Sequence, residues 1–170
     1  MIDATYVVTM ARYNAWQNTQ VRAAFETLSD AELRKERKAF FGSLFKTANH
    51  LLWGDQIWLH RLGAGDPPET MEHLELTPTP AVWAGERYKT DARILHWAES
   101  LDAVDLHGDV TWTSMMMNKT FVQPMSLCVT HFFNHQTHHR GQIHAMLTAA
   151  GATAPVTDLG FMPEAGPWLG

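Results

Sequence analysis

Histidines are dense near the C-terminal end of this chain, and their spacing points to metal chemistry. The 170-residue sequence holds ten histidines, and five of them fall between His131 and His144. Two of these, His135 and His139, are four residues apart, which places both imidazoles on one face of a helix. That spacing allows two rings to address one ion, and it recurs in zinc enzymes. A divalent metal site is therefore the first hypothesis.

A helical wheel places the five histidines in different environments. With His135 set at zero, His139 lies about 40° away inside an apolar stripe, and His144 points to the opposite side. His131 and His138 lie on one edge of the stripe. A single histidine on an apolar face is more often a core residue bonded to a carbonyl. Two adjacent inward imidazoles favour ligation, because a bundle interior seldom supplies the polar partners that both would need.

A catalytic metal site needs a third protein ligand, which must come from another helix. His50 is the best candidate, because it shares a helical face with Trp53, Gly54 and Ile57 at spacings of three, four and seven. Three neutral imidazoles leave an open coordination position, as in catalytic zinc sites. For four further histidines we expect surface or structural roles: His60, His73, His96 and His107.

Polar residues near the stripe are candidates to assist the metal. Gln142 lies at about −20° on the metal-facing stripe, where it could hold a metal-bound water or orient a ligand; an ordinary polar network is the alternative. Asn14 and Asn18 share a face of the first helix and could bond to a free ring nitrogen of a histidine. No Glu stands beside the inward histidines as in His-Glu-x-x-His hydrolases, so His131 or His138 would have to replace that general base.

Other conspicuous side chains are expected to have structural roles. Arg140 points about 140° from His135, which favours helix–helix or dimer contacts over catalysis. Tyr13, Trp16 and Trp53 are expected to pack in the core or to form the wall of a pocket.

The elements that must position these residues are predicted to form a four-helix bundle. This architecture places metal sites between facing helices. Apolar periodicity and Ser, Gly and Pro boundaries predict four long helices: 3–28, 43–62, 81–101 and 124–150. A capping box at Ser29 predicts a short connecting helix. The proline-rich segment 66–80 is expected to be a loop, and the pattern over residues 108–124 predicts a short β-hairpin. The tail after Gly151 is expected to be an irregular strap. Five residues of the third helix are available to the core: Trp83, Tyr88, Ile94, Leu95 and Trp97.

Composition limits the classes of function. Apolar residues make up 45% and charged residues 18%, so we expect one packed domain over 1–170. The net charge of −5, and a basic run at 34–38 that Glu36 interrupts, argue against nucleic acid as a partner. Cys128 is the only cysteine, which excludes an intramolecular disulfide and a thiolate cage. No leader and no membrane span are evident, so a cytoplasmic protein is the simplest expectation.

Three segments together resemble the DinB family, with its YfiT-like relatives, along nearly the whole chain. The strongest is 134–142, NHQTHHRGQ, which is similar to the family signature NHxxxHRGQ. Residues 13–18, YNAWQN, and 49–55, NHLLWGD, support it in the expected order. The damage-inducible designation of the family describes the regulation of a founding member, and implies neither a polymerase nor a DNA-binding protein.

The resemblance implies an all-α, up-down-down-up four-helix bundle with a three-histidine site for zinc or nickel. Carried over by position, the metal ligands are His50, His135 and His139. A homodimer is expected, because members of the family often pair through helix faces. Relatives include thiol-dependent transferases and isomerases, so a hydrolase-like or low-molecular-weight-thiol-dependent enzyme is expected by analogy. The alternative is a non-catalytic metal-binding protein of the stress response or of protein interaction.

Overall fold

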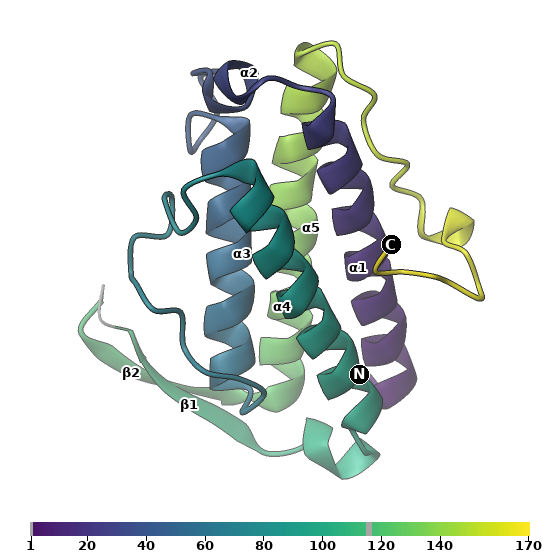
Figure 1. Ribbon diagram of the computed structural model, residues 1–170. Helices are drawn as coiled ribbons and strands as arrows, with labels where there is room; N and C mark the ends of the chain where they lie inside the picture. The colour runs from purple at the N-terminus through teal and green to yellow at the C-terminus, as the bar shows by residue number, and fades with distance from the viewer. Residues whose placement is uncertain (1, 115–116) are drawn as a thin grey trace.

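The computed structural model describes residues 2–114 and 117–170 and consists mainly of helices. A short helix, α2 (Asp30–Arg34), links the first two of four long helices: α1 (Ala4–Glu26), α3 (Leu44–Arg61), α4 (Pro80–Ser100) and α5 (Met125–Ala149). The long helices run up, down, down and up (Figure 1), which confirms the predicted bundle. No helix of the described ranges is long and apolar enough to cross a membrane.

Side-chain caps begin the helices close to the predicted positions. Ser29 accepts a hydrogen bond from the backbone N–H of Glu32 at the start of α2, and Ser43 begins α3 in the same way. Thr79 caps α4, whose first residue is Pro80. These oxygens satisfy N–H groups that have no partner within the helix, and the fixed φ of proline suits the first turn.

The predicted hairpin is present between α4 and α5. Strand β1 (Asp109–Ser114) pairs antiparallel with β2 (Lys119–Pro124), and Trp112 lies opposite Phe121 with ring centroids 5.5 Å apart. Asn118 takes a positive φ of 45° at the turn, a conformation that asparagine tolerates better than most residues. Two tip residues, 115 and 116, lie outside the described ranges. The sheet closes the end of the bundle at which α5 begins (Figure 1).

The buried core has two apolar halves. One half contains Ala11, Leu59, Ile94 and Phe132, and the other contains Phe25, Leu52, Trp83 and Ile143. Each half takes residues from all four long helices, so no helix pair has a core of its own. A third set of buried residues is polar, and it lies between the two apolar halves along every long helix: Asn14, Asn18, Asp55, Arg87, Asp91, Gln136 and Arg140.

One predicted core residue is wrong. Tyr88 is 47% exposed, whereas Trp83, Ile94, Leu95 and Trp97 are buried as expected. Trp83 and Arg87 lie one turn apart on the buried face of α4, and Tyr88 is one residue past that face. The sequence pattern did not reveal that a charged arginine takes the inward position here and displaces the aromatic residue to the surface.

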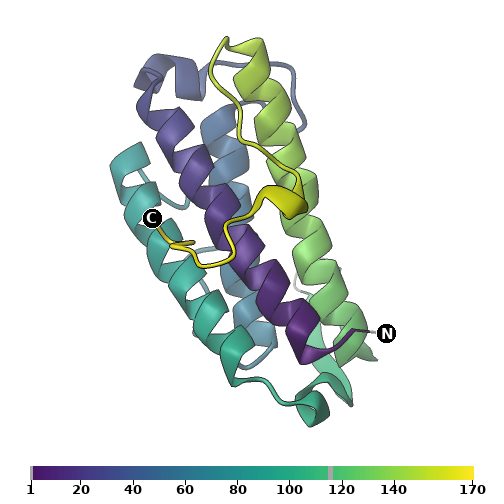
Figure 2. The ribbon, with the colours of Figure 1, turned by 90° about the vertical axis from the view of Figure 1, so that its right-hand side faces the viewer.

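The chain after α5 forms the expected strap across α1 (Figure 2). The Tyr13 hydroxyl donates to the carbonyl oxygen of Thr157 at 2.6 Å, and the Gln17 amide donates to that of Val156 at 2.6 Å. Nearer the C-terminus, the guanidinium of Arg12 lies 4.5 Å from the ring centroid of Trp168. The strap therefore satisfies its backbone carbonyls with side chains of α1.

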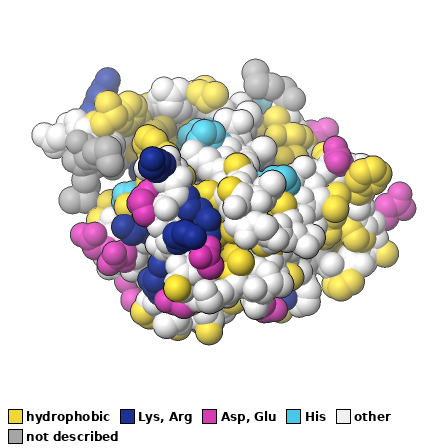
Figure 3. All heavy atoms as spheres, turned by 90° about the horizontal axis from the view of Figure 1, so that it is seen from above, with side chains coloured by type: hydrophobic (Ala, Val, Ile, Leu, Met, Phe, Trp, Pro, Cys, Tyr) yellow, Lys and Arg dark blue, Asp and Glu magenta, His cyan; other side chains and the backbone are white. Residues whose placement is uncertain are grey.

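The basic run near α2 is neutralised locally. Figure 3 views the molecule from the end that carries α2, where Lys and Arg side chains lie among Asp and Glu side chains. Arg34 pairs with Asp30 at 2.8 Å, and both Lys35 and Arg37 pair with Glu32. These cations therefore have acidic partners within the same segment.

Candidate metal centre

Three histidines from two helices converge on one point between α3 and α5. His50 lies on α3, and His135 and His139 lie one turn apart on α5. The ring centroids are 5.3 Å apart for His50 and His135, 4.6 Å for His50 and His139, and 4.4 Å for His135 and His139. One nitrogen of each ring lies within 4.8 Å of the others. In residues 2–114 and 117–170, this is the one group of three or more such side chains that could hold a metal ion.

Gly54 gives His135 the space to lie against α3. A Cβ atom at this position would stand 2.7 Å from Cε1 of His135 and 3.3 Å from its Nδ1, closer than real contacts allow. Gly54 is one turn after His50 on the same face of α3. The glycine therefore lets the imidazole from α5 reach the level of the histidine on α3.

Gln142 fixes the ring of His139. Its Oε1 lies 2.8 Å from Nδ1 of His139, and its amide nitrogen lies 3.2 Å from Nε2 of His138. An amide oxygen can only accept, so Nδ1 of His139 carries the proton and Nε2 keeps its lone pair. These bonds are consistent with the predicted role of Gln142 in orienting a histidine, and its role with a metal-bound water stays a prediction. His138 is exposed and belongs to the same chain of bonds.

His73 reaches the site from the loop between α3 and α4, which sequence reasoning missed. Its Nδ1 lies 2.8 Å from Nδ1 of His50. A surface or structural role was expected for His73. Two further contacts hold this loop against α3: Trp53 donates its indole N–H to the Thr70 carbonyl at 3.0 Å, and the Thr77 hydroxyl donates to Oδ1 of Asn49 at 2.7 Å. No local pattern marks a loop residue that docks on a helix, so the sequence held no signal for His73.

Burial keeps the converging histidines neutral. Burial, together with the neighbouring imidazoles, lowers the pKa of His50 and of His135 to about 3. Burial also lowers the pKa of His139, although the hydrogen bond that its ring donates to Gln142 acts in the opposite direction. All three rings are therefore uncharged at pH 7, with lone pairs available to a cation.

The donor set fits a divalent metal ion. Nδ1 of His135 is buried and has no hydrogen-bond partner, which is costly unless another group satisfies the ring. Nδ1 of His139 is bonded to Gln142, so its Nε2 is free for an ion, and Nε2 of His50 is free in the tautomer in which Nδ1 of His50 donates to His73. Neutral imidazole nitrogens of this kind suit zinc, nickel and other first-row metals.

Aromatic side chains border the three histidines. The ring of Phe41 lies 4.2 Å from that of His50 and 5.5 Å from that of His139. Trp53 stacks beside His50 with centroids 6.2 Å apart, and its place in a pocket wall stays a prediction. Tyr13 instead packs beside Trp16 on α1, with centroids 6.0 Å apart.

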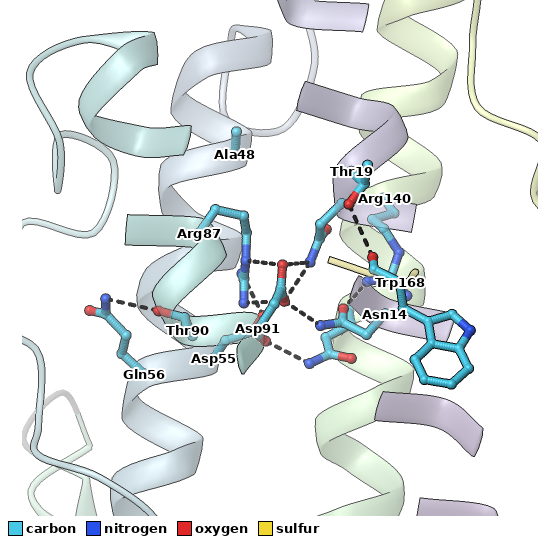
Figure 4. A network of polar contacts seen from close by, with 12 residues as sticks. Asn14, Thr19, Ala48, Asp55, Gln56, Arg87, Thr90, Asp91, Arg140 and Trp168 are labelled. Carbon is cyan, nitrogen blue, oxygen red and sulfur yellow. Dashed lines mark hydrogen bonds and ion pairs between the residues drawn. The ribbon is translucent and has the colours of Figure 1, made fainter. Parts of the chain in front are cut away.

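A buried polar layer crosses the bundle between the long helices (Figure 4). Asp55 accepts from Arg87 at 2.7 Å and from Gln136 at 3.0 Å. Asp91 pairs with Arg87 at 2.8 Å. Burial raises the pKa of Asp91 to about 6, opposed by the charge of Arg87. Gln136 is the neighbour of His135, so its bond to Asp55 sets the register of α5 against α3.

The asparagines of α1 belong to this layer and do not reach the histidines. The Asn14 amide donates to Asp91 at 2.8 Å, its Oδ1 accepts from Arg140, and Asn18 donates to Asp91 at 2.9 Å. The expected bond from Asn14 or Asn18 to a histidine is therefore wrong, because buried charges on α4 and α5 take their polar atoms. For Arg140 the helix–helix alternative is confirmed.

Comparison with known proteins gives consistent matches. The DinB family model matches residues 1–168. Protein DinB of Bacillus subtilis (strain 168) is 25% identical over 155 residues, which cover 88% of this chain and 88% of that protein. The crystal structure of a DinB-like protein from Bacillus cereus ATCC 10987 aligns with a TM-score of 0.64 at 20% identity, over 83% of this chain and 90% of that one. At that identity the match shows a shared fold.

Proposed function

This chain belongs to the DinB family, and from that premise we propose that it is a metal-dependent enzyme using a low-molecular-weight thiol. His50, His135 and His139 are the proposed ligands of one divalent ion, zinc or nickel. The observation that carries the proposal is the convergence of three neutral imidazoles, one of which has a buried nitrogen without a partner.

Three protein ligands leave room for an exchangeable fourth, which is the arrangement of catalytic rather than structural zinc sites. When bound, the ion would act as a Lewis acid that lowers the pKa of a coordinated thiol or water. The residues of the chain hold the geometry: Gln142 orients His139, His73 lies against His50, and Gly54 admits His135. The bond to Gln142 leaves Nε2 of His139 as the donor atom, and donation from Nδ1 of His50 to His73 would do the same for His50.

The groups around the histidines favour a thiol over water as the nucleophile. Hydrolysis requires a base that removes a proton from water, and zinc hydrolases often use a glutamate for this purpose. The nearest acid on α3, Asp55, is fully buried and bonded to Arg87 and Gln136. A thiol ionises far more readily than water, so it needs no such base once its pKa is lowered.

Hydrolysis is the second candidate function, and one observation favours it. His131 is exposed, and its ring centroid lies 5.8 Å from that of His135, so it could take the part of the missing glutamate. A pH–rate profile of any hydrolytic activity in a His131→Gln variant would separate this reading from the first. Loss of the fall in rate on the acidic side of the profile would support a general base, and an unchanged profile would rule this role out.

Metal analysis tests the site itself. We expect purified protein to contain about one divalent ion per chain, and His135→Ala or His139→Ala to lose it. His144→Ala is the matched control, because this histidine is on α5 but outside the group. A full metal content in both ligand variants would overturn the assignment.

Thermal-shift measurements with glutathione, cysteine and coenzyme A test the thiol. A ligand that binds only the folded state raises the melting temperature, so we expect a shift in metal-loaded protein and none in the His135→Ala variant. The alcohol analogue serine is the control for cysteine. If metal-loaded protein responds to no thiol, the non-catalytic metal-binding role replaces the transferase.

A further inference from the structure

A cavity of about 370 Å³ opens between α3, α5 and the hairpin. Its walls are mainly aromatic and aliphatic, in contrast to the buried polar layer. A volume of this size suits a small molecule, and apolar walls with few polar groups are typical of ligand sites. Six residues line it: Trp58, Trp112, Gln123, Leu127, Cys128 and His131.

The cavity is one helical turn from His135 on α5 and about two turns from His50 on α3. His131 precedes His135 by one turn of α5, and Trp58 follows Gly54 by one turn of α3. The rings of Trp58 and His131 are 4.8 Å apart, and those of His131 and His135 are 5.8 Å apart. His131 therefore connects the wall of the cavity to a candidate ligand.

Arg61 does not line the cavity, but it stacks on the two tryptophans that do. Its guanidinium carbon lies 4.8 Å from the ring centroid of Trp58 and 5.4 Å from that of Trp112. The side chain is half-buried, and it forms no ion pair or hydrogen bond with any residue in 2–114 or 117–170. A guanidinium stacked on indoles keeps its N–H edge free, and that edge matches the geometry of a carboxylate.

We propose that this cavity binds a small carboxylate with an aromatic or branched apolar body. The body packs between Trp58 and Trp112, the carboxylate bonds to Arg61, and the other end of the molecule points past His131 toward the three histidines. This orientation follows from the order along α3, where Arg61 is farther from His50 than Trp58 is. The identity of the molecule as a substrate rests on the proposed function, whereas its binding does not.

The probe is 2-naphthoate, with the neutral 2-naphthylmethanol as its matched partner. Binding is measured by ligand-observed saturation-transfer NMR and by titration of the naphthalene fluorescence, using the full chain with and without metal. We expect saturable binding of 2-naphthoate, at least tenfold tighter than that of the alcohol, because a charge-assisted bond to Arg61 is lost in the alcohol.

Arg61→Met keeps the length of the side chain and removes its charge. We expect this variant to bind 2-naphthoate about tenfold more weakly and the alcohol unchanged. Trp112→Ala should weaken both probes. Lys89→Met removes an exposed cation of α4 and should change neither. Equal affinity of the wild type and Arg61→Met for 2-naphthoate would overturn the proposal, and so would the absence of binding at millimolar concentrations.

The position of bound 2-naphthoate relative to the proposed metal centre is tested by a separate measurement. Replacing Zn²⁺ by paramagnetic Co²⁺ should broaden the NMR lines of bound 2-naphthoate, most strongly for ring protons remote from the carboxylate. Binding without this broadening in cobalt-loaded protein would overturn the proposed orientation. If the protein binds no metal but still binds 2-naphthoate through Arg61, the metal proposal fails and the carboxylate site stands.

Discussion

Single residues determine the orientation and the tautomer of the converging histidines. His73 is one of them, and its position was not expected from the sequence. The contact between Nδ1 of His73 and Nδ1 of His50 requires one ring to donate and the other to accept. If His50 donates, its Nε2 keeps the lone pair that a metal needs. Partners of this kind orient metal-bound histidines, and their loss typically costs ten- to one-hundredfold in affinity.

We therefore expect His73→Ala to weaken Zn²⁺ binding about tenfold. His73→Asn places an amide near the position of Nδ1 and should restore most of the affinity. The dissociation constant is measured by competition with a chromophoric chelator, and the control is His96→Ala on α4, outside the histidine group. Equal affinities of the wild type and His73→Ala would show that His73 has no positioning role.

Gly54 and Gly85 provide a matched pair of helical glycines. A Cβ at Gly54 would stand 2.7 Å from the ring of His135, whereas a Cβ at Gly85 on α4 meets nothing within 4 Å. Alanine is favoured over glycine in a helix by about 1 kcal/mol. We expect Gly85→Ala to raise the free energy of unfolding by roughly this amount and to leave metal affinity unchanged.

Gly54→Ala should displace the ring of His135 and weaken metal binding, because the clash is with the imidazole itself. Chelator competition measures the affinity, and urea unfolding of metal-free protein measures the stability. If Gly54→Ala bound metal as tightly as Gly85→Ala does, the close packing of α3 against the imidazole would be irrelevant to the site.

At the scale of helices, the buried polar layer fixes the register of one helix against another, which the two apolar halves of the core do not fix. Apolar contacts tolerate sliding of one helix along another, but Arg87 must meet Asp55 on α3 and Asp91 on its own helix. Gln136 then ties α5 to the same carboxylate of Asp55. These bonds specify the register at which His50 lies opposite His139.

Arg87→Met should destabilise the protein by about 3–5 kcal/mol, because two buried carboxylates lose their cation. Lys89→Met, on the exposed face of α4, should change stability by less than about 0.5 kcal/mol. Urea unfolding monitored by circular dichroism gives both values. A loss below about 1 kcal/mol in Arg87→Met would mean that the layer contributes little to stability.

At the scale of the whole molecule, stability without metal should fall in mild acid. Burial lowers the pKa of His50 and His135 to about 3 from an ordinary value near 6.5. Between these values the unfolded chain binds more protons than the folded one, so stability is full above pH 6.5 and is lost as the pH falls. Asp91 acts in the opposite direction, because its pKa is raised to about 6. Burial also raises the pKa of Asp55, but it lowers the pKa of His131 and His139 as well, so four histidines act against two aspartates.

The measurement is the urea midpoint of EDTA-treated protein at pH 7 and pH 5. We expect a lower midpoint at pH 5, a smaller difference in His135→Gln, and a larger difference in Asp91→Asn. A midpoint that is equal or higher at pH 5 would contradict this balance.

The expected homodimer stays a prediction, which light scattering at several concentrations would check.

Local signals explain why so much of the fold was predictable. Ser43 and Thr79 are caps, and Asn118 marks a turn, so the helices and hairpin follow from residues near in sequence. Spacing also placed His135 and His139 on one face. His73 and the partners of Asn14 were not predictable, because each depends on a contact between residues far apart in the chain, which no periodicity records.

The order of the ligands along the chain has a consequence for biosynthesis. His50 leaves the ribosome when only α1 and α2 precede it, and His135 and His139 follow after about half of the chain has been added. Both apolar halves also lack α5 until then. A nascent chain would therefore hold only one of the three proposed ligands until His135 is added, and uptake of an ion by the site would be a late event that reports a completed bundle.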